Sequence, residues 1–230
     1  MKVIAKIHTD FLEKFGVPRQ SGLVASLTGK IVFEPEYRVA EAVRGLEGYS
    51  HIWLLWQFSQ AMRETWSPTV RPPRLGGNQR LGVFATRSPY RPNPIGLSSV
   101  RLEKIAVEEQ FGPVLYISGA DLLDGTPIYD IKPYLPFTDS HPEAIGGFSD
   151  ACAAYGLQVE IPEELLAKIP LDKQEALLGV LAQDPRPAYQ NDPQRIYGLK
   201  FGVQNICFRV QENVLSVTAV EAAGQDGEKT

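Results

Sequence analysis

Two polar stretches of the chain hold most of the side chains that could do chemistry. The first, residues 70–99, reads VRPPRLGGNQRLGVFATRSPYRPNPIGLSS. Its Arg87 and Arg91 carry planar guanidinium groups that suit a carboxylate or a phosphate, Asn93 adds an amide, and Gly96 permits a close backbone approach. Several prolines fix the backbone φ angle, so the loop is stiff and its side chains are held in place. The stretch predicts a rigid binding loop; a structural proline corner whose arginines pair with acids is the alternative.

The second stretch, residues 119–136, reads GADLLDGTPIYDIKPYLP and carries three acids beside a strand end. Asp121, Asp124 and Asp130 could bind a metal ion, hold ribose hydroxyls or accept a proton. They could also simply build the loop as Asx turns. Positive charge from Lys132 and from the arginine-rich loop would compete with a bound cation. We therefore expect no metal site, with a Mg²⁺-dependent hydrolase kept as an alternative.

Arginine is concentrated in one segment of an otherwise acidic protein. The net charge is −4, yet residues 63–94 contain six arginines against a single acid, Glu64. Such a stripe predicts a surface that faces phosphates, whereas a solvated face without a ligand is the alternative. Trp66 and Tyr90 lie in the same segment and are candidate stacking surfaces for a base, although a core role explains each equally well. The arginines are Arg63, Arg71, Arg74, Arg80, Arg87 and Arg91.

Several common sites have no support in the sequence. No G-x-G-x-x-G follows a strand and no G-x-x-x-x-G-K-[ST] occurs, so neither a Rossmann-type cofactor site nor a triphosphate loop is predicted. The three histidines are not spaced for a metal, and the two cysteines are interpreted as buried free thiols. No run of about 18 apolar residues occurs, and residues 1–11 resemble a short strand more than a secretory signal. We expect a cytoplasmic protein without a membrane segment.

The elements that must position these stretches are mostly strands. Residues 1–137 contain short apolar runs broken by Pro and Gly, as in a β-barrel or β-sandwich, with one helix expected around Tyr37–Leu46. Residues 138–156 are small and polar and are interpreted as a linker or irregular crossover. The expected strands are Val3–Ile7, Ile31–Phe33, Ile52–Phe58, Leu81–Thr86, Leu97–Val107 and Val114–Ala120.

The last third of the chain predicts a small α+β domain at 157–221, followed by a flexible tail at 222–230. Leu157–Ile161 could be a strand, and a helix is expected from Asp172, capped by that residue together with Glu175. Residues 197–210 and 214–220 resemble the two arms of a hairpin. The fold class expected from the whole chain is mainly β, with a larger β domain and a smaller α+β domain.

Six segments together resemble the TrmO (TsaA-like) family, and they span nearly the whole chain. Two of them are the polar stretches described above, RSPYRPNPIGLS and DLLDGTPIYDIKPYLPF. The others are VPRQSGL, RGLEGYSHIWLLWQF, VRPPRLGGN and AQDPRPAY, which begin at residues 17, 44, 70 and 182. Motifs of this length rarely arise by chance, and no signature position departs from the family pattern.

The resemblance implies a small S-adenosylmethionine-binding β-barrel, unlike a Rossmann fold, with a C-terminal domain. It implies a homodimer that methylates N6 of N6-threonylcarbamoyladenosine at position 37 of threonine tRNA, beside the anticodon. A methyltransferase for another substrate and a non-catalytic RNA-binding adaptor are the alternatives.

Site residues follow from the same resemblance together with side-chain chemistry. We expect Asp124 to act as the general base, with Asp130 and Lys132 as further catalytic candidates. Contacts to tRNA are expected from Arg71, Arg74, Arg80, Arg91, Arg186 and Tyr189. Contacts to the cofactor are expected from Pro18, Arg19, Gln20, Ser59, Gln60, Arg87, Leu97, Asp121, Leu122, Leu123 and Asp124.

Overall fold

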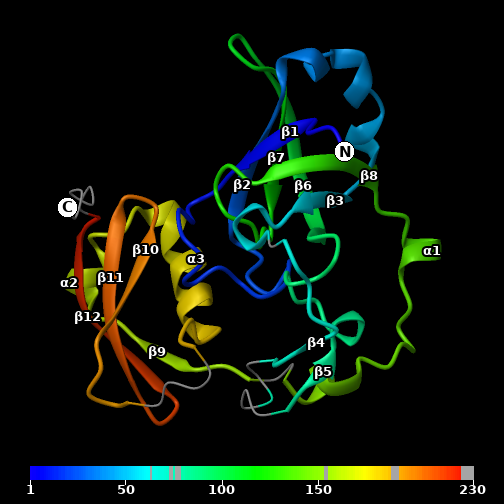
Figure 1. The fold of residues 1–230 in the computed structure, drawn as a ribbon. Helices are drawn as coiled ribbons and strands as arrows, with labels where there is room; N and C mark the ends of the chain where they lie inside the picture. Colours follow the sequence, from blue (N-terminus) through cyan, green and yellow to red (C-terminus); the bar gives the residue numbers. More distant parts are fainter. Residues whose placement is uncertain (63, 73–74, 76–78, 153–154, 188–191, 224–230) are drawn as a thin grey trace.

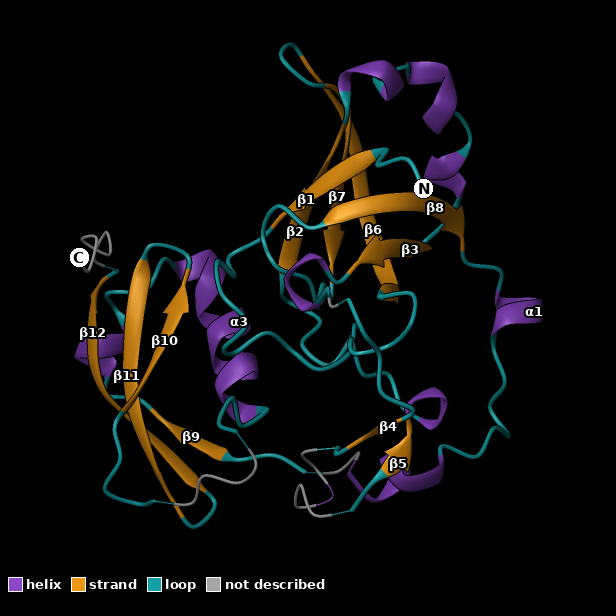
Figure 2. Ribbon diagram, viewed as in Figure 1, coloured by secondary structure: helices purple, strands orange, loops and turns teal. Residues whose placement is uncertain are grey.

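The protein is mainly β and is built around a closed six-stranded antiparallel barrel (Figures 1 and 2). The computed structural model describes residues 1–230 except 63, 73–74, 76–78, 153–154, 188–191 and 224–230. Around the barrel the strands follow the order β1-β2-β7-β6-β3-β8. Their bounds are Ala5–His8 (β1), Thr28–Phe33 (β2), His51–Gln57 (β3), Ile95–Glu108 (β6), Gly112–Ser118 (β7) and Pro127–Pro133 (β8). The expected fold class, a β-barrel with a smaller α+β domain, is confirmed.

Alternation of side chains along the strands fills the barrel. In β3 the residues Ile52, Leu54 and Trp56 are buried, while their neighbours are only partly covered. Successive side chains of a strand point to opposite faces, so these three face the interior. On the adjacent strand β6, Ser98 and Val100 are buried in the same way. Ser98 is therefore a polar group placed among apolar ones, and it needs a hydrogen-bond partner.

The helix expected around Tyr37–Leu46 is wrong. The chain forms three short 3-10 turns instead, at Pro35–Tyr37, Ala40–Val43 and Leu46–Gly48. The backbone of Val39 and of Arg44 is extended, and Gly45 adopts a left-handed conformation with φ of 87°. These three residues interrupt the apolar stripe, so no continuous helix can form over it.

Two further expectations in the barrel domain need correction. Leu81–Thr86 is not one strand, because only Leu81–Gly82 (β5) is extended and it pairs with Thr69–Val70 (β4) in a separate hairpin. Val83–Ala85 then forms a 3-10 turn. The second polar stretch, expected to be a loop, contains strand β8, so Asp130 and Lys132 lie on a strand. A proline at each end of β8 hid it, since proline is typical of turns.

The C-terminal part forms a four-stranded sheet of order β10-β11-β12-β9, in which β9 runs parallel to β12. The segment expected as one arm, 197–210, is two strands joined at Gly202, which has φ of 57°. The strands are Gln158–Glu160 (β9), Tyr197–Phe201 (β10), Gln204–Gln211 (β11) and Val214–Ala222 (β12). Two short helices, α1 (Pro136–Asp139) and α2 (Glu163–Leu166), lie on either side of the connection between the barrel and the C-terminal sheet. This connection includes a 3-10 turn at Gly147–Cys152.

The main helix, α3, spans Leu171–Ala182, and its expected capping box is absent. The residue that caps it is Pro170, which has extended backbone and makes no side-chain cap hydrogen bond. Asp172 therefore lies inside the first turn, where its negative charge still complements the helix dipole. The buried face of α3 is formed by Ala176, Leu177, Val180 and Leu181.

The segment 9–27, which leaves strand β1, joins the barrel to the C-terminal domain. Phe11, Val24 and Leu27 are buried in the hydrophobic cluster of the C-terminal sheet and α3, not in the barrel core. Lys173 of α3 also pairs with Asp10. In Figure 1, α3 lies between the C-terminal sheet and this segment. The C-terminal domain therefore helps to hold segment 9–27 in position against the barrel.

Candidate functional site

A cavity of about 190 Å³ opens at one end of the barrel. Its walls are largely apolar and aromatic, with Asp121 as the one acid and Lys14 as the one base among the described residues that line it. Mostly apolar walls with a few polar groups are typical of a small-molecule site. The lining comprises Lys14, Val17, Trp56, Gln57, Phe58, Ser59, Gln60, Ala61, Pro89, Tyr90, Asp121, Leu123 and Thr126.

Asp121 is the chemically distinctive group of this cavity. Burial raises the pKa of its carboxyl to about 6, against the influence of a hydrogen bond from Ser98, backbone hydrogen bonds and the charge of Arg87. The Ser98 hydroxyl donates to Asp121 Oδ1 over 2.6 Å. A carboxylate held in an apolar wall is costly to leave without a partner, so it favours a ligand with a positive charge or hydrogen-bond donors.

The predicted loop residues meet beside Asp121. The Arg87 guanidinium donates to the Gln20 side chain, which links the proline-rich loop to segment 9–27. Segment 9–27 itself is fastened to the strand end by hydrogen bonds from Gly22 N to Gly119 O (2.9 Å) and from Gly119 N to Leu27 O (2.8 Å). The two polar stretches that were singled out from the sequence therefore converge on one site with segment 9–27.

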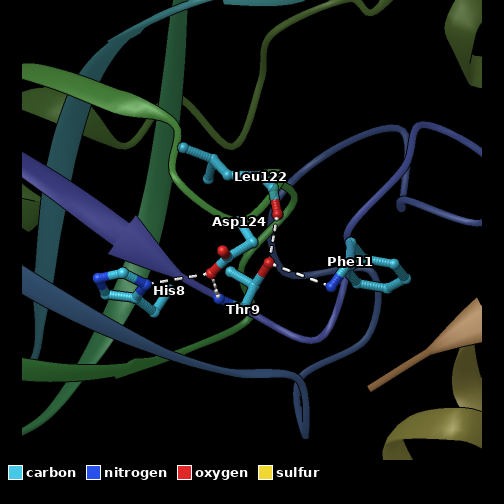
Figure 3. A network of polar contacts seen from close by, with 5 residues as sticks. All are labelled: His8, Thr9, Phe11, Leu122 and Asp124. Carbon is cyan, nitrogen blue, oxygen red and sulfur yellow. Dashed lines mark hydrogen bonds and ion pairs between the residues drawn. The ribbon is translucent and has the colours of Figure 1, made fainter. Parts of the chain in front are cut away.

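Asp124 lies on the other side of this turn, outside the cavity lining. Its Oδ1 accepts hydrogen bonds from Thr9 N (3.1 Å) and lies 3.2 Å from His8 Nδ1. Figure 3 shows the His8 ring and the Thr9 backbone nitrogen directed toward this carboxylate, while the Thr9 hydroxyl lies toward Leu122 O and the Phe11 ring points away. The Asp124 side chain keeps 34% of its surface exposed, so one face is open to solvent. The role of general base for Asp124 stays a prediction.

Asp130 and Lys132 form an ion pair on the outer face of the barrel. Lys132 Nζ lies 2.8 Å from Asp130 Oδ2, and both side chains are substantially exposed. Asp130 is the neighbour of Leu55 on β3, which in turn pairs with Leu97 on β6. Leu97, a predicted cofactor contact, is thus on the same outward face and is half exposed. These three residues do not line the cavity.

Four of the predicted cofactor residues line the cavity, and the others lie outside its lining. Ser59, Gln60, Asp121 and Leu123 are part of the lining, whereas Leu122 is buried in the barrel core. Of the family motif in segment 9–27, Pro18 is buried, Gln20 is half-buried and Arg19 is exposed. Tyr90, expected as a stacking surface for a base, also lines the cavity, whereas the other lining residues were not among the predicted site residues. The end of β3, Trp56–Gln57–Phe58, could have been found, because it directly precedes the predicted Ser59.

The arginine-rich segment presents part of its charge on the β4–β5 hairpin. Val70 pairs with Leu81, so Arg71 and Arg80 flank this pair at the same end of the hairpin. Both are exposed, and Arg80 also donates to the Thr69 hydroxyl over 3.0 Å. Arg91 is half-buried and donates to Thr86 O over 3.2 Å. Arg63, Arg74 and Tyr189 lie outside the described residues.

Arg186 is placed differently from the other predicted tRNA contacts. Its guanidinium is buried and donates twice to Asp184, over 2.8 Å and 3.0 Å. Tyr155 donates to the same carboxylate over 2.6 Å. These bonds raise the pKa of Arg186, so the pair is firmly charged. In this structure Arg186 holds the D-P-R-P turn together, and a contact with tRNA stays a prediction.

The described residues contain neither a metal-binding cluster nor a membrane-spanning helix. No group of three or more His, Cys, Asp or Glu side chains among them could hold a metal ion. Within the same residues no helix is both long and apolar enough to cross a membrane.

Comparison with known proteins gives a consistent picture along the whole chain. Residues 6–140 match the model of the tRNA-methyltransferase O N-terminal domain, and residues 154–223 match that of the TrmO C-terminal domain. The chain is 44% identical over 226 residues to a tRNA (adenine(37)-N6)-methyltransferase of Escherichia coli K12, covering 95% of this chain and 96% of that protein. It is 45% identical to a putative S-adenosylmethionine-dependent methyltransferase, RcsF, of Pseudomonas aeruginosa, covering 86% of each.

Solved structures agree with this. A crystal structure of TrmO from Pseudomonas aeruginosa superposes with a TM-score of 0.78 at 34% identity, covering 96% of this chain and 97% of that one. The two matched domain models coincide with the barrel and with the C-terminal sheet, in the same order along the chain. The chain belongs to the tRNA-methyltransferase O family.

Proposed function

We propose that the protein transfers a methyl group from S-adenosylmethionine to N6 of adenosine 37 in tRNA. The observation that carries this proposal is the 44% identity, over 95% of the chain, to the E. coli protein named for that reaction. The barrel supports it by bringing an apolar cavity with one buried acid next to a segment rich in exposed arginine.

The residues of the cavity fit S-adenosylmethionine chemically. The cofactor has an apolar adenine face, ribose hydroxyls, a positively charged ammonium and sulfonium, and one carboxylate. Leu123, Val17 and Phe58 offer apolar surface, and Asp121 offers an acceptor for a donor or a cation. We propose that Arg87, held by Gln20, pairs with the cofactor carboxylate as a bidentate fork.

Calorimetric titration of S-adenosylmethionine into the protein tests this placement. Arg87→Ala should weaken binding at least tenfold, because a charge-assisted bidentate pair is lost. Arg44→Ala, which removes an arginine that is 76% exposed and paired with Glu41, is the matched control and should leave binding unchanged. Equal affinity of the Arg87 variant and the control would place the carboxylate elsewhere.

When bound, the cofactor supplies a methyl group already activated by its sulfonium. The chain then has to hold the acceptor nitrogen in line and to take its proton. Holding two reactants at near-attack distance contributes roughly 7–11 kcal/mol in favourable cases. We propose Asp124 as the base, because its carboxylate is fixed by Thr9 N and keeps an exposed face. The Asp130–Lys132 pair is proposed to orient the acceptor group.

Asp124→Asn tests the base. The amide keeps an oxygen acceptor for Thr9 N but cannot accept a proton from the substrate. Methyl transfer under saturating substrates should fall by about 10²–10⁴-fold, because the base is lost. Near-normal turnover would assign the proton transfer to another group, and Asp130→Asn measured in parallel would show whether it is that one.

We propose that tRNA phosphates lie along the β4–β5 hairpin. Arg71 and Arg80 are exposed and flank the same strand pair, so two positive charges lie at one end of the hairpin, where they can meet phosphates. The exposed rings of Trp66 and Phe84, with centroids 6.1 Å apart, lie in the same segment and offer a surface for a splayed base. Arg91 is proposed to extend this surface, and contacts of Arg74, Arg186 and Tyr189 with tRNA are proposed from the family resemblance alone.

The charge-reversed double variant Arg71→Glu/Arg80→Glu tests the surface. Binding of tRNA should weaken and depend less steeply on salt concentration, because counterion release accompanies each phosphate contact. Calorimetric binding of S-adenosylmethionine should not change. Arg44→Glu is the control for net charge. If the double variant and the control bind tRNA alike, the hairpin is not the phosphate surface.

The exact nucleoside and tRNA that accept the methyl group are proposed from the family resemblance. We propose N6-threonylcarbamoyladenosine of threonine tRNA as the acceptor. Its carbamoyl nitrogen has a delocalised lone pair, so it is a weak nucleophile that gains from a base such as Asp124. Threonine tRNA with and without the threonylcarbamoyl group should differ at least a hundredfold in methyl acceptance. Equal acceptance would make plain adenosine the substrate.

We also propose a cytoplasmic homodimer, again from the family resemblance. Light scattering behind size-exclusion chromatography should give twice the chain mass of 25.5 kDa. A monomer at that mass would contradict the proposed assembly, and recovery of the tagged protein from another cell fraction would contradict the proposed location.

A further inference from the structure

A buried chain of hydrogen bonds runs through the barrel wall to Asp121. Trp56 Nε1 donates to Ser98 Oγ over 2.9 Å, and Ser98 Oγ donates to Asp121 Oδ1 over 2.6 Å. The three residues come from β3, from β6 and from the segment after β7. Ser98 is 1% exposed and Trp56 is 7% exposed, so water has little access to either link.

The direction of this chain is fixed by the chemistry of its members. An indole N–H can only donate, so Ser98 Oγ must accept from Trp56. Ser98 has a single hydroxyl proton, which is then available for Asp121. Asp121 Oδ1 is consequently held as an acceptor, and the short Ser98–Asp121 distance is typical of a charge-assisted bond to a carboxylate.

Packing holds the first member of the chain in place. Gly96 lies against the Trp56 indole so closely that an added Cβ would come within 2.2–2.6 Å of three ring atoms. The ring also meets Phe58 edge-on, with centroids 4.3 Å apart. The indole therefore cannot turn its N–H away from Ser98 without a clash. This contact also explains the glycine within the sequence motif.

Near neutral pH the hydrogen bond from Ser98 influences how much of Asp121 is ionised. Burial raises the pKa of Asp121 to about 6, while Ser98, the backbone and Arg87 act in the opposite direction. The other described titratable groups that line the cavity are Lys14 and Tyr90. Lys14 donates to Gln60 O over 2.8 Å, so its ammonium already has a partner. Small changes in the bond from Ser98 should thus shift how much of Asp121 is ionised.

We propose that Trp56 and Ser98 are positioning residues that hold Asp121 as a hydrogen-bond acceptor toward the cofactor cavity. The part of the ligand that meets Asp121 is then a cation or a hydrogen-bond donor, such as an ammonium or a pair of ribose hydroxyls. This inference rests on the proposed function in that the cavity takes S-adenosylmethionine.

Calorimetric titration of S-adenosylmethionine across pH tests the proposal. Binding to the wild-type protein should strengthen as pH rises through the pKa of Asp121. Ser98→Ala removes a donor that favours the carboxylate, so it should move this midpoint to higher pH and weaken binding near neutral pH about tenfold. Trp56→Phe should act in the same direction with a smaller effect, since Ser98 then becomes free to rotate.

A matched control and a double variant separate positioning from general damage. Ser118→Ala removes another buried serine of the barrel, one that does not line the cavity and whose hydroxyl donates to the Glu103 carboxylate over 2.5 Å. This variant should leave the pH profile of binding unchanged. In an Asp121→Asn background, Ser98→Ala should cost less than twofold. A full tenfold loss in that background, or no loss in the wild-type background, overturns the proposal.

Direct titration of Asp121 distinguishes this proposal from the proposed function. Carbon-13 NMR of the aspartate carboxyl groups, assigned with Asp121→Asn, reports the pKa without any ligand. Ser98→Ala should raise that pKa even if the wild-type protein binds no S-adenosylmethionine, an outcome that would reject only the proposed cofactor. An unchanged pKa would reject the hydrogen-bond chain while leaving the cofactor proposal standing.

Discussion

Replacing Phe11 by Ala should weaken the whole protein, because this one ring anchors segment 9–27 in the C-terminal core. Phe11 is 1% exposed and meets Phe201 edge-on with ring centroids 5.7 Å apart. Truncating a fully buried Phe costs about 3–5 kcal/mol, of which about 0.5–1.5 kcal/mol belongs to the aromatic pair. For a chain of this size the melting temperature should fall by roughly 6–20 °C.

The Phe11 backbone extends the effect to the candidate site. Its carbonyl accepts a hydrogen bond from Asp124 N over 2.8 Å, and Val17 and Leu123 of the cavity wall pack against the same hydrophobic cluster. Affinity for S-adenosylmethionine should therefore fall several-fold in Phe11→Ala, although Phe11 does not line the cavity.

Urea denaturation followed by circular dichroism measures the free energy of unfolding, and calorimetry measures the affinity. Phe137→Ala is the matched control, since that ring is 87% exposed and its removal should change stability by less than about 0.5 kcal/mol. A loss below about 1 kcal/mol in Phe11→Ala would show that the C-terminal domain does not depend on this anchor.

Three further predictions concern the site and the turn beside it. Gly96→Ala should destabilise the protein by about 3 kcal/mol in urea denaturation, because the added Cβ meets a packed indole. Gly82→Ala is the control and should be near neutral, because nothing lies within 4 Å of its added Cβ. Equal effects of the two variants would contradict the packing argument. Arg186→Met should cost about 3–5 kcal/mol by thermal unfolding, because it leaves Asp184 buried without its cation; a neutral effect would mean that the pair is dispensable. Asp121 has a folded-state pKa of about 6 against an ordinary 3.8, so wild-type stability should be lost as pH rises through this window, by at most about 3 kcal/mol. Asp121→Asn should consequently be more stable than wild type at about pH 8 but not at about pH 3.5, and parallel pH curves would refute this.

The barrel could be predicted where its strands are short apolar runs. The run HIWLLWQ predicts a strand because it is short, apolar and rich in aromatic residues, whereas only the structure shows which alternate residues face inward. Strand β8 could not be found by this rule, because prolines bound it and polar residues occupy its outer face. The stripe at Tyr37–Leu46 misled for the opposite reason, since its apolar spacing suits a helix but Gly45 turns the chain left-handed.

The loop residues of the candidate site could be predicted from the sequence, but the contacts made by the barrel strands could not. Arg87, Gln20 and Asp121 belong to motifs that stand out in the sequence, and the structure brings them to one place. The hydrogen-bond chain joins Trp56, Ser98 and Asp121, which are separated by 42 and 23 residues. Only the pairing of β3 with β6 and the closure of the barrel bring these residues together, and no local pattern encodes that contact.

The most direct test of the proposed reaction follows the methyl group itself. S-adenosylmethionine labelled in its methyl group is incubated with the protein and threonine tRNA that carries threonylcarbamoyladenosine at position 37, and the digested nucleosides are analysed by mass spectrometry. The account predicts one labelled methyl on the base of residue 37, and none with tRNA that has another base there. Label at a different nucleoside, or none while the cofactor binds, would contradict it.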